Sequence, residues 1–76
     1  MSKALICINT ITSSPSIIDD LKNIVGVSEV HSSKGMYDIV ALVKADSMNE
    51  LREIVLPDIR RLDNVKSTLT LTILES

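Results

Sequence analysis

Apolar residues along the 76-residue chain follow two spacings, and the spacing changes at serine, glycine and proline positions. Residues 3–11 are mostly apolar and predict a strand, as do residues 65–74, in which apolar and polar side chains alternate. Residues 36–45 contain the run IVALV and predict a third strong strand. The shorter and more polar segment 27–33 predicts a strand at an edge of the sheet, joined to the next strand by a tight turn at Lys34 and Gly35.

A first helix is predicted between the first two strands. The sequence Ser-Ser-Pro at 13–15 is typical of a helix start, with serine as the N-cap and proline at the first helical position. Gly26 is expected to end this helix. Its apolar face is predicted from residues at helical spacing: Ile17, Ile18, Leu21, Ile24 and Val25.

A second helix is predicted to begin at Ser47, because residues 47–50 match the S-x-x-E capping box. Apolar residues at helical spacing continue to Leu62, and Asn64 is expected to stop the helix. Pro57 lies inside this pattern and has no backbone N–H to donate. It is therefore expected to kink the helix or to split off its last turn.

The order β-α-β-β-α-β predicts one domain, residues 1–76, with an α+β, ferredoxin-like sandwich. Two helices would cover one face of a four-stranded antiparallel sheet, with the first and third strands in the centre. On the uncovered face we place the threonines of the last strand with Ile6, Ile8, Val40 and Leu42. A half-apolar, uncovered face on so small a domain predicts dimerisation through that face, with or without a ligand.

The amino-acid composition argues against nucleic-acid binding, membrane insertion and disulfide formation. The net charge is −2, Lys and Arg are scattered, and one aromatic residue is present, so direct nucleic-acid binding is not expected. No segment is apolar and long enough for a membrane span, and the N-terminus does not resemble a signal peptide. The single cysteine, Cys7, rules out an internal disulfide and favours a reducing compartment. We therefore expect a soluble, cytoplasmic protein without membrane partners.

Catalytic and metal-binding chemistry has little support. Cys7 and His31 are the only soft metal ligands, whereas a structural zinc needs about four, so neither a metal nor a cofactor is expected. Cys7 alternates with Leu5, which we expect in the core, and so predicts a buried thiol. We expect no catalytic residue and no enzyme. The alternative is a small dimeric α/β-barrel enzyme with His31 or Tyr37 as acid or base.

Asp38 raises a separate question, because a carboxylate directly before the apolar run 39–43 is costly if it is buried without a partner. Gly35 precedes it in the same turn, and Thr68 and Thr70 offer hydroxyl groups on the last strand. Together these groups would suit a small zwitterion, with Asp38 binding an ammonium and free amides near Gly35 binding a carboxylate. They need not meet within one subunit but would meet across an interface. From the residues alone, a solvated strand end is the simpler explanation of Asp38.

Two stretches of the chain resemble motifs of a known protein family. Residues 35–40, GMYDIV, resemble its G-x-(aromatic)-D turn leading into an apolar strand, and residues 65–70, VKSTLT, resemble its V-x-x-T-x-T strand. In order and spacing the whole chain resembles the effector-binding (RAM) domain of the Lrp/AsnC transcriptional regulators. The resemblance implies that Gly35, Met36 and Tyr37 meet the main-chain groups of an amino-acid effector, that Asp38 meets its amino group, and that Thr68 and Thr70 line the opposite wall.

The same resemblance implies a homodimer formed through the sheets, which assembles into larger rings with effectors held between dimers. The helix-turn-helix domain of full-length members is missing from these 76 residues, so the chain resembles a stand-alone version of the domain. Regulation of transcription or metabolism would then be indirect, for instance by mixed assembly with full-length Lrp/AsnC-type regulators. The alternative, suggested by the uncovered sheet face, is an oligomerisation module without a ligand.

Overall fold

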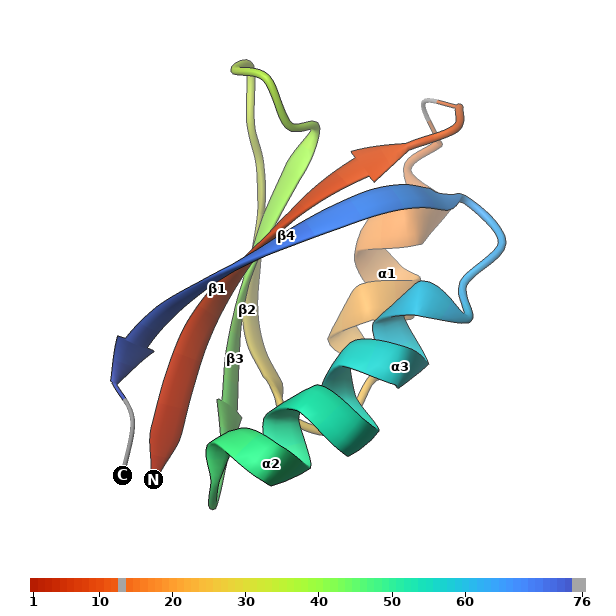
Figure 1. Cartoon of the computed structure of the whole chain (residues 1–76). Helices are drawn as coiled ribbons and strands as arrows, with labels where there is room; N and C mark the ends of the chain where they lie inside the picture. The colour runs from red at the N-terminus through yellow and green to blue at the C-terminus, as the bar shows by residue number, and fades with distance from the viewer. Residues whose placement is uncertain (13, 75–76) are drawn as a thin grey trace.

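The computed structural model describes residues 1–12 and 14–74, so Ser13 of the predicted helix start lies outside the described residues. The sheet has the strand order β2-β3-β1-β4, and every neighbouring pair is antiparallel. Both helical segments lie on one side of it (Figure 1). The predicted ferredoxin-like βαββαβ sandwich is confirmed. Its elements, in chain order, are β1 (Ser2–Thr10), α1 (Ser16–Lys22), β2 (Val27–Ser32), β3 (Ile39–Ala45), α2 (Met48–Glu50), the π-helical turn η1 (Leu51–Val55), α3 (Leu56–Arg60) and β4 (Val65–Leu74).

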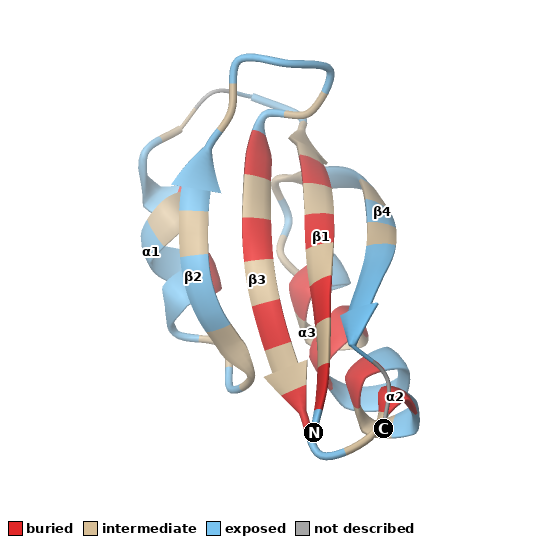
Figure 2. Ribbon diagram, turned by 90° about the vertical axis from the view of Figure 1, so that its left-hand side faces the viewer, coloured by how far each residue is buried: buried red, intermediate tan, exposed pale blue. Residues whose placement is uncertain are grey.

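The two central strands define the core by strict alternation, which Figure 2 shows as bands of buried and half-buried residues along β1 and β3. Ile6 and Ile8 are fully buried beneath the helices, so their predicted position on the uncovered face is wrong. Val40 and Leu42 are half-buried on the opposite, uncovered face, as predicted. The error arises because β1 carries apolar residues on both faces, so alternation alone does not tell which face packs against the helices.

The threonines of β4 share the face of Ile6 and Ile8. Thr68 pairs with Ile8 and Thr70 with Ile6, and paired residues of antiparallel strands point to the same side. The uncovered surface, which we call the open sheet face, therefore carries a different set of residues: Leu5, Cys7, Val40, Leu42, Leu69 and Leu71. Leu5 and Cys7 were expected in the core. Both are half-buried on the open sheet face instead, so the Cys7 thiol is not a core thiol.

The first helix is shorter than predicted. It begins at Ser16, directly after Pro15, and none of the described side chains caps its start. It ends at Lys22, so Val25 lies beyond it and is 87% exposed rather than part of the apolar face. Gly26 belongs to the turn that follows, where its φ of +100° suits glycine. An added Cβ would lie 2.8 Å from Cγ2 of Val55, so this turn packs tightly against the second helical segment.

The second helical segment shows how proline is accommodated. Ser47 caps its start as predicted, since the hydroxyl oxygen accepts a hydrogen bond of 3.1 Å from the amide of Glu50. Before Pro57 the helix widens into the π turn η1, in which the Leu56 amide donates to the Leu51 carbonyl. Pro57 then lies in the first turn of α3, where its missing N–H is tolerated. The proline thus divides the helix, as predicted, and a π turn joins the parts.

The third strand begins at Ile39, three residues later than predicted, because residues 33–38 form an irregular loop rather than a tight turn. Asn64 does not stop a helix directly, since α3 ends at Arg60. Its side chain instead holds the turn after β1: the amide of Thr12 donates to Oδ1 and Nδ2 donates to the Thr12 carbonyl, both at 2.8 Å. Within the described residues, no helix is long and apolar enough to cross a membrane.

The two glycines provide a matched test of the fold. We expect Gly26→Ala to lower the free energy of unfolding by about 1–3 kcal/mol, because the new methyl group meets Val55 in a strained backbone conformation. Gly35→Ala is expected to change it by less than about 0.5 kcal/mol, since only Ser33 Oγ, at 3.7 Å, is near the added atom. Urea unfolding at one protein concentration measures both values. Equal losses in the two variants would contradict the packing assigned to Gly26.

Candidate functional site

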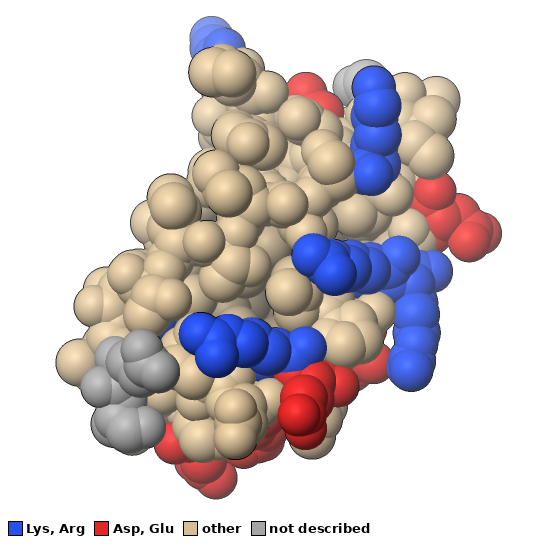
Figure 3. Space-filling model, in the orientation of Figure 1, with Lys and Arg blue, Asp and Glu red and all other residues tan. Residues whose placement is uncertain are grey.

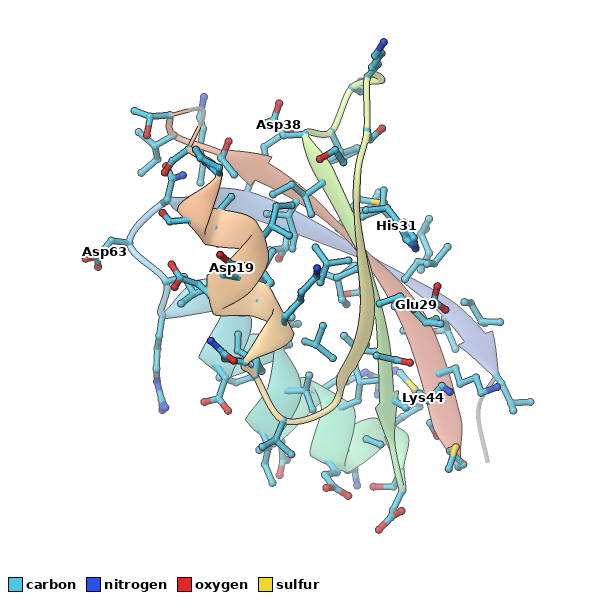
Figure 4. The ribbon with its side chains drawn as sticks, turned by 180° about the vertical axis from the view of Figure 1, so that it is seen from behind. Asp19, Glu29, His31, Asp38, Lys44 and Asp63 are labelled. Carbon is cyan, nitrogen blue, oxygen red and sulfur yellow. The ribbon has the colours of Figure 1, made fainter. Side chains whose placement is uncertain are left out.

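Asp38 lies immediately before β3 and beside the end of β1 (Figure 4). Its Oδ2 accepts two hydrogen bonds from Thr10, at 2.8 Å from the amide and at 3.0 Å from the hydroxyl. Its own amide donates to the Ile8 carbonyl at 3.0 Å, and its carbonyl accepts from the Ser33 amide at 2.8 Å. The carboxylate therefore extends the pairing of β1 with β3 by one step beyond the regular strand. The side chain is exposed, so the expected burial cost does not arise.

The same contacts favour the charged form of Asp38. The hydrogen bond from the Thr10 amide, and then that from the Thr10 hydroxyl, lower the pKa of the carboxyl below 3.8, and a smaller effect of desolvation opposes them. Both bonds end on Oδ2. Within residues 1–12 and 14–74, no group donates a hydrogen bond to Oδ1. Asp38 thus presents a fixed negative charge with one oxygen available.

Asp38 lines a cleft of about 560 Å³, which we call the Asp38 cleft. The end of β1 and the turn after it, the start of α1, the end of β2 and the start of β3 surround it. Asp38 is the only charged residue among the described residues that line it. Hydroxyl groups, including those of Thr10, Thr12 and Ser14, share the walls with isoleucine side chains. The cleft therefore combines one carboxylate, neutral hydrogen-bonding groups and aliphatic surface.

The other residues predicted from the turn lie outside this lining. The Gly35 amide donates to Ser33 Oγ at 3.2 Å, so the loop folds back on itself. Met36 is 90% exposed, and Tyr37 is half-buried. Of the predicted turn residues, only Asp38 reaches the cleft within one subunit.

Thr68 and Thr70 are not brought to Asp38. Strand β1 separates β4 from β3, and neighbouring strands lie about 4.8 Å apart, so about 10 Å of sheet separates the two backbones. Thr68 instead accepts a hydrogen bond of 3.2 Å from Nε of Arg60. The expected meeting of the turn with the two threonines is therefore absent within one subunit and would need a second one.

The cleft includes residues that sequence reasoning did not select. Thr10 is the last residue of β1, Thr12 and Ser14 lie in the connection between β1 and α1, and Ser33 lies in the loop before Asp38. The concentration of hydroxyl residues at 10–16 was a usable signal. That this connection would lie against Asp38 follows only from the pairing of β1 with β3.

The remaining reactive side chains lie away from the cleft. His31 is on β2, 69% exposed in its side chain, with Nε2 at 3.2 Å from Oε1 of Glu29 (Figure 4). Cys7 lies on the open sheet face. In the part of the chain that the structure describes, no three His, Cys, Asp or Glu side chains group to hold a metal ion.

The fold and the Asp38 cleft define a small α+β domain with one carboxylate-lined cleft. The family model of the Lrp/AsnC ligand binding domain matches residues 4–76, so the chain belongs to this family. A comparison with curated proteins gives no match.

Solved structures agree with this assignment. The chain is similar to Escherichia coli AsnC, with 26% identity and a TM-score of 0.86 over 99% of this chain and 52% of that one. It is also similar to TTHA0845 from Thermus thermophilus, with 30% identity and a TM-score of 0.87 over 100% of this chain and 96% of that one. A Neisseria meningitidis regulator, NMB0573 in complex with L-Met, shares the fold at 15% identity and a TM-score of 0.79, over 97% of this chain and 50% of that one. The chain thus spans about half the length of AsnC, and its stand-alone character stays a prediction.

The hydrogen bonds from Thr10 predict a pH-dependent contribution to stability. Because the folded state lowers the pKa of Asp38, the stabilisation is fully present above about pH 4, the usual range of the unfolded carboxyl, and is lost as the pH falls through the lower folded pKa. We expect Asp38→Ala to reduce the free energy of unfolding at pH 7, and this deficit to shrink below pH 3.8. Asp63→Ala is the control, since the exposed Asp63 accepts no hydrogen bond from the described chain. Denaturant unfolding at several pH values measures both, and a pH-independent deficit for Asp38→Ala would contradict the assignment.

Proposed function

We propose that this Lrp/AsnC ligand-binding domain senses an amino acid through the Asp38 cleft and works as a homo-oligomer. The observation that carries the proposal is the available Oδ1 of Asp38, held at a fixed position in a cleft of hydroxyl and aliphatic groups. An ammonium group is the natural partner of such a carboxylate. Hydroxyl groups and isoleucine side chains suit the polar and aliphatic parts of the same ligand.

The loop before Asp38 supplies a complementary feature. The amides of Lys34, Met36 and Tyr37 make no hydrogen bond within the described chain, and they follow one another around Gly35. Amides of this kind suit the carboxylate of an amino acid. Because these residues lie outside the lining of the Asp38 cleft, we propose that the effector site is completed at a junction of subunits, where Thr68 and Thr70 of a neighbouring copy would form the other wall.

The comparisons support the ligand class. The matching family model describes a ligand binding domain, and E. coli AsnC belongs to the same family. The Neisseria regulator of similar fold was solved with L-Met, which is a property of that protein. For the present chain we propose an indirect, non-catalytic role in regulating transcription or metabolism, with full-length Lrp/AsnC-type regulators as candidate partners.

The open sheet face supports the oligomer. Leu69 and Leu71 are 43% and 48% exposed there, beside the half-buried Leu5 and Leu42. Polar and charged residues share this face, since Glu29 pairs with Leu42 and His31 with Val40, and Lys3 pairs with Lys44 at its end. An apolar sheet face without a covering layer favours packing against a second sheet. The same observation supports the second candidate function, an oligomerisation module without an effector.

Isothermal titration calorimetry with the twenty amino acids tests the sensing function. We expect at least one amino acid to bind, and Asp38→Ala to weaken that binding about tenfold or more, because a charge-assisted contact to its ammonium is lost. Asp63→Ala is expected to bind as tightly as the parent, since Asp63 does not line the Asp38 cleft. Absence of binding by any amino acid would favour the oligomerisation module.

Light scattering tests the open sheet face. We expect Leu71→Glu to shift the parent oligomer toward monomer at micromolar concentration, because a buried, unpaired carboxylate opposes sheet packing. Ile54→Glu is the matched control, since Ile54 is 55% exposed on the helical side and Leu71 is 48% exposed on the open sheet face. A monomeric parent, or equal effects of the two substitutions, would refute dimerisation through this face.

A further inference from the structure

A second concave region lies on the side of β4 that faces the helices. It has a volume of about 400 Å³ and is lined by the end of α3 and the start of β4. Its lining residues are Arg60, Val65, Lys66, Ser67 and Thr68, and we call it the Arg60 groove. Among residues 1–12 and 14–74, none is shared with the Asp38 cleft and no acidic residue lines the groove. A protein of net charge −2 thus has two cationic residues and the Thr68 hydroxyl at one hollow.

Arg60 is held across this groove. Its Nε donates to Thr68 Oγ1 at 3.2 Å, which links the last turn of α3 to β4. Within the described residues, its terminal nitrogens Nη1 and Nη2 have no hydrogen-bond partner and no carboxylate within salt-bridge distance. The neighbouring Arg61 behaves differently, since its Nη1 pairs with Asp58 at 3.1 Å. Arg60 is therefore positioned but not neutralised.

Lys66 reaches the groove through an irregularity in the strand. Thr10 pairs with Val65 and Asn9 with Ser67, so Lys66 is the extra residue of a bulge in β4. A bulge redirects the side chain of the extra residue and is frequent beside functional sites. Lys66 is exposed and, like Arg60, makes no ion pair within the described chain.

The hydroxyl of Thr68 adds a donor of defined direction. Its oxygen already accepts from Arg60, so its proton remains available to a ligand. A planar guanidinium, an ammonium and a hydroxyl are donors that proteins use for oxyanions. Figure 3 shows Lys and Arg side chains gathered where β4 begins and α3 ends.

We propose that the Arg60 groove binds a small oxyanion, a phosphate or carboxylate group, with Arg60 as the fork-shaped donor, Lys66 as the second charge and Thr68 as a neutral donor. Arg60 contributes its two terminal nitrogens, because Nε is already bound to Thr68. None of the groove residues lines the Asp38 cleft of the same subunit. Thr68 is shared, because the amino-acid site proposed above takes the Thr68 of a neighbouring copy as part of its wall.

Titration of the full chain followed by amide NMR shifts tests the site. Inorganic phosphate and acetate are the probes, and sodium chloride keeps the ionic strength constant. We expect saturable shifts at residues 65–68 and about tenfold or more weaker phosphate binding in Arg60→Gln. Arg60→Lys, which keeps the charge but loses the planar fork, is expected to be intermediate. Tighter binding of phosphate than of acetate assigns the groove to a phosphate group, and the reverse order assigns it to a carboxylate.

Two control variants separate a site from general surface charge. Arg61→Gln removes the same charge at the adjacent position, outside the groove lining, and is expected to bind phosphate like the parent. Asp38→Ala, which alters the proposed amino-acid site, is also expected to leave phosphate binding unchanged. Non-saturable shifts at residues 65–68, or equal weakening in Arg60→Gln and Arg61→Gln, would overturn the proposal.

Discussion

The antiparallel pairing of β1 with β3 is the constraint on which the other parts of the structure depend. It places Ile6 opposite Ala41 and Ile8 opposite Ile39. These buried residues form the sheet side of the hydrophobic core, against which both helical segments pack. Once this pair is set, β2 and β4 can only add at its two edges. The pair ends where Thr10 meets the carboxylate of Asp38, so the edge of the core is also the start of the Asp38 cleft.

The register of this pair decides which residues are available to a partner. With Ile6 and Ile8 beneath the helices, Leu5 and Cys7 turn to the open sheet face, and Thr68 and Thr70 turn toward the helical side. A one-residue change would exchange all of these positions. Because β1 is apolar on both faces, its sequence contains no preference strong enough to fix the choice, and the faces were assigned incorrectly for this reason. The strand order was predictable, since the βαββαβ sequence of elements allows few connections.

Local irregularities account for most of the other differences. The bulge in β4 places Val65 against the core and Lys66 in the Arg60 groove, although simple alternation assigns Val65 to the face of Leu69. The π turn η1 lets the helical segment continue past Pro57, whereas the sequence pattern predicts only a kink or a break at this proline. Bulges and π turns depend on which tertiary contacts they improve, so a pattern of apolar residues does not specify them. The helix cap at Ser47 was predictable, because Ser47 and Glu50 are three residues apart and their contact is local.

Asp38 depends both on a local sequence feature and on a tertiary contact. Its presence before an apolar strand was visible in the sequence, but its partner, Thr10, is 28 residues away and is known only from the fold. The two hydrogen bonds occupy one oxygen and fix the orientation of the carboxylate, which is the condition under which the other oxygen can select a ligand at little entropic cost. A purely structural role and a binding role are therefore not alternatives here. The bonds that stabilise the end of the central strand pair are the same bonds that would hold the charge in place for an ammonium group.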